Sequence, residues 1–237
     1  MDRRASVEGS VLKIIAFDAD DTLWDCQSWF DDVERRCQEL LKPWATPREV
    51  SEGLFATEQR NLSLTGYGTK AFTLSLIENA VRVSRGQLSG DDVMQLIEMG
   101  KELLRFPTTP LPEVRETLEQ LSQSRRYRLV VFTKGELMDQ EDKLRRSGLE
   151  EFFSYMETVS NKTETEYRQL CENLGVAPEQ TLMVGNSFRS DIVPALNSGA
   201  WAIHIPYHVV WALEQSEEYP HDRLIKIARF SEILSHL

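Results

Sequence analysis

The stretch VLKIIAFDADDTLW, residues 11–24, decides the fold of this chain. Its first part, residues 11–17, is a mainly apolar run with the length of a buried strand, and the acidic cluster after it marks the strand's end. Similar short runs follow at residues 127–132, 155–159, 181–184 and 200–205. Continuous apolar strands are typical of a parallel sheet covered on both faces, so we expect these runs to pair in one sheet.

Helical patterns connect the later runs, at residues 136–147, 163–174 and 189–198. Each of them ends at a glycine, the usual stop signal at the C-terminus of a helix. The first places Leu137, Gln140 and Leu144 on one face, and we expect another helix at residues 224–237 from its apolar spacing. Strands that alternate with helices predict the α/β class, with a doubly wound parallel sheet.

A long helical segment interrupts this alternation after the first strand. Residues 25–106 contain no strand-like run, whereas a simple crossover between parallel strands needs only ~10–12 residues. Thr46 and Glu49 form a capping box with Pro47 between them, and Ser89 precedes an acidic first turn. We therefore predict an inserted domain of four helices at residues 25–106, and a core domain built from residues 1–24 and 107–237.

Composition narrows the possible functions. The 237 residues include 27 basic and 38 acidic side chains, a formal charge of −11, which disfavours general binding to nucleic acids or anionic membranes. No apolar run approaches the ~20 residues of a spanning helix. Cys26, Cys37 and Cys171 form no metal-binding pattern. We expect a cytoplasmic protein, a monomer or homodimer, with no nucleic-acid or membrane partner. The acidic run at residues 214–218 is expected to be a solvated face.

Two carboxylates lie where the first strand ends. Asp18 and Asp20 share a face, with Cα atoms about 7 Å apart if the strand stays extended. The carboxyl ends of parallel strands are where open α/β sheets bind ligands. Burying two like charges there is unfavourable without a cation or a proton. The pair therefore predicts Mg²⁺, a raised pKa, or both.

The other predicted strands end in polar groups of complementary chemistry. Residues 127–132 lead into Thr133 and Lys134, and residues 155–159 are followed by Lys162. Residues 181–184 lead into Gly185 and the loop that carries Asn186 and Asp191. Because the ends of parallel strands meet at one edge, these groups are expected to converge with Asp18 in a cleft suited to phosphate.

The series Asp18-x-Asp20-x-Thr22, Thr133, Lys162 and Gly185-Asn186-x4-Asp191 resembles the four motifs of the haloacid dehalogenase-like (HAD) hydrolase superfamily. The helical insertion after the first motif is similar to that superfamily's C1-type cap, and the resemblance spans about residues 11–205. It implies a Rossmann-like core and a Mg²⁺-dependent phosphatase that hydrolyses phosphomonoesters through an aspartyl phosphate.

The resemblance also implies a role for each matching residue. Asp18 is the expected nucleophile, and Asp20 the general acid and then base, for which a raised pKa is expected. Thr133 and Lys162 are expected to bind the phosphoryl oxygens. Lys134, beside Thr133, competes with Lys162 for that role.

The expected Mg²⁺ ligands are a carboxylate oxygen of Asp18, the backbone carbonyl of Asp20 and a side chain of the Asn186/Asp191 loop. Many family members carry Asp where this chain has Asn186. An amide oxygen can bind Mg²⁺ but brings no charge, so weaker metal binding is expected. Asp191 is expected to supply the negative charge nearby.

The substrate is expected to be a small phosphorylated metabolite. Tyr67 and Lys70 in the insertion, and Trp24 beside the first motif, are candidate substrate contacts. Alternatives remain open: a phosphomutase acting on a sugar phosphate uses the same motifs, and a non-catalytic ligand-binding or scaffold protein could be built on this fold. Dehalogenation is disfavoured because a halide needs no acid such as Asp20. A receiver domain needs no such insertion.

Overall fold

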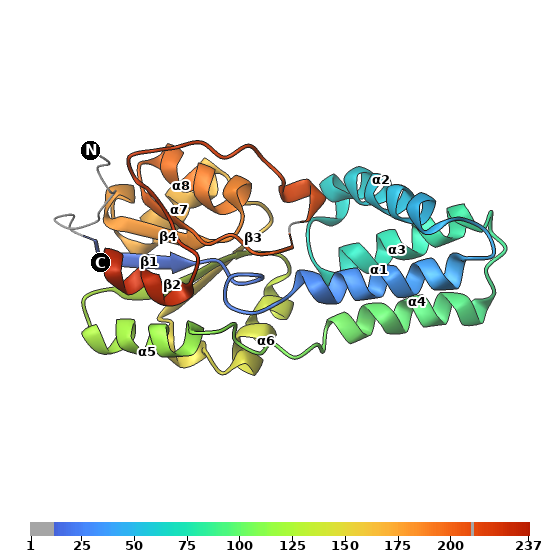
Figure 1. Cartoon of the computed structure of the whole chain (residues 1–237), viewed down its shortest axis with the longest axis horizontal. Helices are drawn as coiled ribbons and strands as arrows, with labels where there is room; N and C mark the ends of the chain where they lie inside the picture. The colour runs from blue at the N-terminus through green and yellow to red at the C-terminus, as the bar shows by residue number, and fades with distance from the viewer. Residues whose placement is uncertain (1–11, 210) are drawn as a thin grey trace. The chain divides into compact units, whose positions relative to one another are not determined.

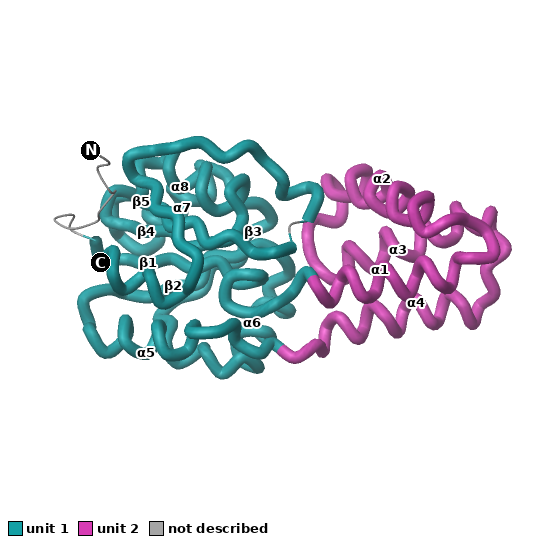
Figure 2. Tube along the Cα trace, in the orientation of Figure 1, with its two compact units in different colours: residues 1–27, 108–237 teal, residues 28–107 magenta. Residues whose placement is uncertain are grey.

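A computed structural model gives the structure of the chain and describes residues 12–209 and 211–237. Val11, the first residue of the expected opening strand, lies outside the described residues, as do the residues before it. The chain divides into two compact units, residues 1–27 with 108–237 (unit 1) and residues 28–107 (unit 2) (Figure 2).

Unit 1 contains a six-stranded sheet in which all neighbouring strands are parallel. The strands are β1 (Ile14–Phe17), β2 (Arg128–Lys134), β3 (Tyr155–Val159), β4 (Thr181–Gly185), β5 (Trp201–His204) and β6 (Leu224–Lys226). Their order is β3-β2-β1-β4-β5-β6, so the direction of winding reverses between β1 and β4. Such a switch point is where ligands bind in open α/β sheets, and it lies beside Asp18.

Helices cover both faces of the sheet (Figure 1). These are α5 (Val114–Ser124), α6 (Leu137–Ser147), α7 (Glu164–Leu174) and α8 (Val193–Ser198). Side chains of β1 alternate between the faces: Ile14 and Ala16 join a buried cluster with residues of α7 and α8, whereas Phe17 contacts the rings of Phe153 and Phe230. The doubly wound fold expected from the sequence is therefore confirmed.

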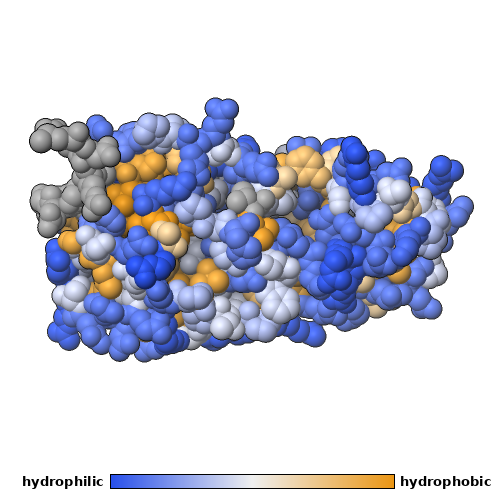
Figure 3. Space-filling view, viewed as in Figure 1, coloured by the Kyte–Doolittle hydropathy of each residue, from blue (hydrophilic) through white to orange (hydrophobic). Residues whose placement is uncertain are grey.

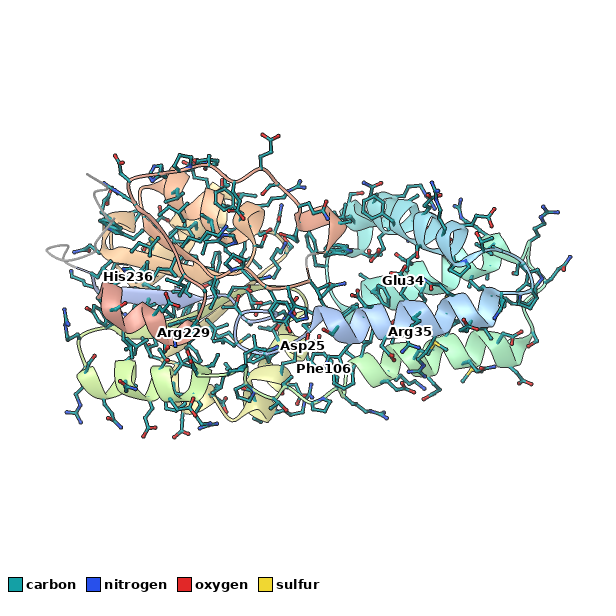
Figure 4. The ribbon with its side chains drawn as sticks, viewed as in Figure 1. Asp25, Glu34, Arg35, Phe106, Arg229 and His236 are labelled. Carbon is teal, nitrogen blue, oxygen red and sulfur yellow. The ribbon has the colours of Figure 1, made fainter. Side chains whose placement is uncertain are left out.

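Unit 2 contains a bundle of helices with its own apolar core. The helices are α1 (Gln27–Leu41), α2 (Pro47–Thr65), α3 (Thr69–Val83) and α4 (Gly90–Leu103), of which α1 begins at the last residue of unit 1. Thr46 caps α2 with the capping box expected from the sequence, and Ser89, expected only to precede a helix, caps α4 with a capping box as well. On α1, Glu34 accepts a hydrogen bond from Ser51 of α2, which ties these helices together; Glu34 is labelled in Figure 4.

The C-terminal segment differs from the expected helix. Residues 224–226 form β6, and a 3-10 helix, η5 (Phe230–His236), follows; Arg229 and His236 at its ends are labelled in Figure 4. Phe230 and Ile233 are buried. Their spacing of three residues fits a 3-10 helix as well as an α-helix, which explains why the helix prediction was wrong.

Three smaller expectations also need correction. The predicted helix at residues 189–198 is preceded and partly replaced by a π-helical turn, Phe188–Ile192, before α8. Leu137, expected to share a face of α6 with Gln140 and Leu144, is 58% exposed, whereas those two residues are buried. Glu214, expected in a solvated face, is largely buried in an ion pair with Lys134.

The surface shown in Figure 3 is mainly hydrophilic, as the acidic composition leads one to expect. Within the described residues, no helix combines the length and the apolar character needed to cross a bilayer.

Candidate active site

A buried ammonium links two carboxylates at the carboxyl edge of the sheet. Lys162 Nζ lies 2.5 Å from Asp18 Oδ1 and 2.6 Å from Asp191 Oδ1, and its side chain is 1% exposed. Asp18 follows β1, Lys162 follows β3, and Asp191 lies in the π-helical turn after β4. The structure therefore brings together three of the side chains that were expected from the sequence to converge.

The loop after β4 is held against the first motif by Thr22. The Thr22 hydroxyl lies 3.0 Å from Asp18 Oδ2 and 3.1 Å from Asn186 Oδ1, and it accepts the backbone N–H of Asn186 at 3.1 Å. One hydroxyl proton serves one acceptor at a time. Thr22 thus places the Asn186 amide oxygen beside the carboxylate of Asp18.

Gly185 makes the close approach of Asp191 possible. A Cβ atom on Gly185 would lie 2.3 Å from Asp191 Oδ2 and 2.6 Å from its Cβ. The backbone N–H of Ser187 donates to Asp191 Oδ2 at 2.9 Å, so both carboxylate oxygens of Asp191 have partners. Asp191 is 1% exposed. It therefore acts as the buried counter-charge of Lys162 in this arrangement.

The second carboxylate of the motif, Asp20, is held by three side chains, of which Gln140 and Lys143 lie outside the expected set. Trp24 Nε1 donates to Oδ1 and Gln140 Nε2 to Oδ2, each at 2.8 Å. Lys143 Nζ lies 3.2 Å from Oδ1 and 3.1 Å from Oδ2. Asp139, one helical turn before Lys143 on α6, is the second carboxylate of that ammonium, at 3.3 Å.

The environments of Asp18 and Asp20 shift their pKa values in opposite directions. Burial, reinforced by the charge of Asp191, raises the pKa of Asp18 to about 7 in the metal-free protein. Burial also acts to raise the pKa of Asp20, but the charge of Lys143 and the hydrogen bonds from Gln140 and Trp24 outweigh it and lower the pKa. The raised pKa expected for Asp20 from the sequence is therefore wrong in this state.

Lys162 keeps its charge despite burial. Burial acts to lower the pKa of its ammonium, but the charges of Asp18 and Asp191 outweigh that effect and raise the pKa. A cationic Lys162 beside Asp18 can offset negative charge on a phosphoryl group bound there.

Thr133 and Lys134 lie at the end of β2. Thr133 is 1% exposed, and its hydroxyl lies 3.4 Å from the backbone carbonyl of Lys134. Lys134 Nζ forms an ion pair with Glu214 and donates to Ser190 Oγ at 2.8 Å. Glu214 also accepts hydrogen bonds from the hydroxyls of Ser187 and Ser190, each at 2.5 Å. Glu214 therefore competes with a bound phosphate for the ammonium of Lys134.

The three candidate substrate contacts differ in position. Trp24 is fully buried, and its indole N–H donates a hydrogen bond to Asp20. It therefore supports the Asp20 carboxylate and has no exposed face for a substrate to contact. Both of the others lie in unit 2: Tyr67 in the turn between α2 and α3, where Gly66 and Gly68 have positive φ, and Lys70 in the first turn of α3. Their contact with a substrate stays a prediction.

Sequence reasoning missed Lys143 and Glu214. Gln140 and Leu144 were recognised only as one face of a helix, and Lys143 lies between them in the same pattern. A lysine four residues after an aspartate, Asp139, is ordinary on a helix surface, so burial was the missing information. Glu214 ends the 3-10 helix Ala212–Glu214, which is too short to show a periodicity in the sequence.

The oxygen donors around Asp18 fit a hard divalent cation. Asp18 Oδ2 and Asn186 Oδ1 both lie within 3.1 Å of Thr22 Oγ1, and carboxylate, amide and carbonyl oxygens are the donors that Mg²⁺ takes. Among the described residues, no group of three or more His, Cys, Asp or Glu side chains is placed to bind a metal. A magnesium site here therefore needs the amide of Asn186 and the backbone carbonyl of Asp20 in addition to carboxylates.

The fold and the side chains around Asp18 are those of a haloacid dehalogenase-like hydrolase. The family model of haloacid dehalogenase-like hydrolases matches residues 12–199, and the chain belongs to that family. This confirms the resemblance drawn from the four motifs.

Three relatives show how far the likeness extends. The chain is 29% identical over 209 residues to the glyceraldehyde 3-phosphate phosphatase of Methanothermobacter thermautotrophicus, covering 81% of this chain and 85% of the relative. A haloacid dehalogenase-like family hydrolase from Xanthomonas campestris superposes with a TM-score of 0.84 at 31% identity, covering 98% and 93%. A HAD-hydrolase from Bacillus subtilis, described as bound to magnesium, shares the fold with a TM-score of 0.63 at 16% identity, covering 94% and 97%.

Proposed function

We propose that this chain is a Mg²⁺-dependent phosphatase that hydrolyses a small phosphomonoester through an aspartyl phosphate on Asp18. The observation that carries the proposal is the placement of Asp18, whose carboxylate lies 2.5 Å from the Lys162 ammonium and 3.0 Å from the Thr22 hydroxyl at the switch point of the sheet. Asp18 must be ionised to attack phosphorus, and the charge of Lys162, which acts to lower the pKa of Asp18, favours the ionised form.

The reaction has two steps that balance at named atoms. A carboxylate oxygen of Asp18 bonds to phosphorus while the bond from phosphorus to the ester oxygen breaks, and Asp20 gives its proton to the departing alkoxide. Water then attacks phosphorus and passes a proton to Asp20, which releases phosphate and restores Asp18. The first step requires Asp20 to take up a proton against the charge of Lys143.

Magnesium would be held by Asp18, the backbone carbonyl of Asp20 and the side chain of Asn186. When bound, it supplies positive charge that stabilises the phosphoryl oxygens. Asp191 then acts through Lys162, which it contacts at 2.6 Å, rather than as a direct ligand. Thr133 is proposed to donate its hydroxyl to a phosphoryl oxygen. Support for magnesium comes from the oxygen donors described above and from the magnesium-bound Bacillus subtilis relative.

A small phosphorylated metabolite is the proposed substrate. The phosphatase relative from Methanothermobacter thermautotrophicus makes glyceraldehyde 3-phosphate the first ester to test. The four helices of unit 2 are proposed to act as a C1-type cap, with Tyr67 and Lys70 as its candidate substrate contacts. We also propose a cytoplasmic location.

The test is the release of phosphate from glyceraldehyde 3-phosphate and a panel of small phosphate esters with Mg²⁺, comparing the wild type with Asp18→Asn. We expect phosphate release by the wild type and a loss of at least about 10⁴-fold in the variant, because removal of a nucleophile abolishes the covalent route. Removal of Mg²⁺ by a chelator is expected to stop turnover as well.

Asp222→Asn serves as the control, since Asp222 is exposed and lies outside the cluster. It is expected to retain wild-type rates. Equal rates in Asp18→Asn and Asp222→Asn would overturn the proposed nucleophile. Isomerisation of a sugar phosphate without phosphate release would indicate a mutase instead.

A further inference from the structure

The Asp20 carboxylate lies in a clamp made of three side chains, Trp24, Gln140 and Lys143. Each carboxylate oxygen has two donors: Trp24 and Lys143 on Oδ1, and Gln140 and Lys143 on Oδ2. One donor comes from the turn after β1 and two come from α6. This clamp fixes both the position of the carboxylate and its rotation.

The Gln140 amide is oriented for this contact. Its Nε2 donates to Asp20 Oδ2 at 2.8 Å and to the backbone carbonyl of Lys134 at 3.0 Å. Its Oε1 is buried and has no hydrogen-bond partner within the described residues. Flipping the amide would set its oxygen against two acceptors, so the two contacts of Nε2 determine its orientation.

Lys143 is held in place independently of Asp20. Its side chain is 2% exposed, and Asp139 Oδ2 lies 3.3 Å from Nζ on the side of the same helix. The aliphatic chain is therefore buried between α6 and the turn after β1, where Cys26 Sγ lies 3.8 Å from Nζ. When Asp20 takes up a proton, Asp139 remains a charged partner of this ammonium and can keep Lys143 beside Asp20.

We infer that Lys143, assisted by Asp139, is a positioning residue that aims the Asp20 carboxylate at the leaving-group oxygen. This inference rests on the proposed function and adds to it a residue from α6. Proton transfer in a transition state is effective only when the acid is aligned with the reacting oxygen. Lys143 touches neither the substrate nor the phosphoryl group in this account, and it acts through Asp20.

Leaving groups of different basicity separate this role from a general loss of structure. An alkyl phosphate releases a basic alkoxide that needs a proton, whereas 4-nitrophenyl phosphate releases a phenolate that needs little help. If Lys143 aligns Asp20, Lys143→Met will lower kcat for the alkyl ester by about 100-fold and for the aryl ester by less than about 3-fold. A loss of folding or of metal binding would lower both rates by the same factor.

The experiment measures kcat and KM for both esters in the wild type, Lys143→Met, Lys143→Arg and the exposed control Lys101→Met. Lys101 also forms an ion pair, with Glu98, but it lies on α4 of unit 2. Lys101→Met is therefore expected to leave both rates unchanged. Lys143→Arg keeps the charge and is expected to recover part of the alkyl rate. Asp139→Asn, which leaves Lys143 in place, is expected to give a smaller selective loss and serves if Lys143→Met fails to fold.

A double variant completes the test. In an Asp20→Asn background, Lys143→Met is expected to cause no further selective loss, because the group it positions is gone. Equal losses on both esters in Lys143→Met and Asp139→Asn, or an additive effect in the double variant, would overturn the inference. A wild type that hydrolyses neither ester would instead overturn the proposed function on which the inference rests.

Discussion

The protein buries two lysines beside the two aspartates of its first motif, and they are held in different ways. Lys162 bridges Asp18 and Asp191, which come from distant parts of the chain. Lys143 bridges Asp20 and Asp139, and Asp139 precedes it by one turn on α6. The topology of the sheet therefore determines which carboxylates surround Lys162, whereas for Lys143 one of the two carboxylates comes from its own helix. This difference separates the residues that sequence order can predict from those that depend on packing.

The largest expected effect is the loss of the Lys162 charge. Lys162→Met leaves Asp18 and Asp191 buried without their cation, so we expect the free energy of unfolding of the metal-free protein to fall by about 3–5 kcal/mol. Saturating Mg²⁺ is expected to restore part of this loss, because it binds only the folded site. Urea unfolding with and without Mg²⁺ measures both effects.

Lys143→Met is the matching variant for the second lysine, and its free energy of unfolding is compared with that of Lys162→Met. Asp139 loses its cation too, but the Asp20 side chain is 27% exposed and keeps the donors Trp24 and Gln140, so we expect a smaller loss, about 2–3 kcal/mol, with little recovery in Mg²⁺. The same urea series measures it. Equal recovery of the two variants by Mg²⁺ would show that the two lysines serve one site rather than two.

A smaller effect is expected where the backbone approaches Asp191. Gly185→Ala places a methyl group within 2.3 Å of Asp191 Oδ2 and must displace the buried carboxylate from Lys162. We expect a loss of about 2 kcal/mol in thermal or urea unfolding, together with a slower rate of phosphate release. Gly90→Ala is the control, since a Cβ there meets nothing within 4 Å. If both variants match the wild type, the packing around Asp191 is looser than described.

A substitution of Asn186 is expected to strengthen Mg²⁺ binding rather than weaken the protein. Asn186→Asp adds a negative charge beside Asp18, where Thr22 holds the two side chains together. We expect Mg²⁺ binding to tighten by about ten-fold, or about 1.4 kcal/mol. A Mg²⁺ titration by calorimetry, and of phosphate release, measures it. Unchanged affinity would remove Asn186 from the proposed ligands.

The smallest expected effect is the pH dependence of the Lys134–Glu214 pair. Burial acts to raise the pKa of Glu214, but the charge and hydrogen bond of Lys134 outweigh it and lower the pKa below its ordinary 4.5. A lowered folded-state pKa stabilises the protein above about pH 4.5, and the contribution is lost as the pH falls through the folded value. We expect Glu214→Gln to cost about 1 kcal/mol at pH 7 and less at pH 3.5, in urea unfolding. A larger cost in acid would contradict the pairing.

Much of the fold and part of the cluster follow from the sequence. The apolar runs and their terminal polar residues predicted that Asp18, Lys162 and Asp191 would meet, because parallel strands present their carboxyl ends at one edge. The contacts at 2.5 and 2.6 Å agree with that expectation. The roles of these residues in catalysis remain predictions.

The remaining features depend on information that local pattern does not carry. Lys143 reads as an ordinary surface residue of a helix until its burial is known. Glu214 reaches Lys134 from a short 3-10 helix after β5, and the spacing of Phe230 and Ile233 fits two kinds of helix. The lowered pKa of Asp20 results from its contact with Lys143, which the sequence pattern does not reveal.

The most direct test of the central claim is to locate the phosphoryl group on the protein during turnover. The enzyme is mixed with Mg²⁺ and an ester that it hydrolyses, quenched in acid, and digested in acid with pepsin, because an acyl phosphate hydrolyses at the alkaline pH that trypsin needs. Mass spectrometry is expected to find one phosphoryl group on a peptide that contains Asp18, assigned by fragmentation to that residue. A phosphoryl group on another residue, or phosphate release by Asp18→Asn at the wild-type rate, would contradict the account.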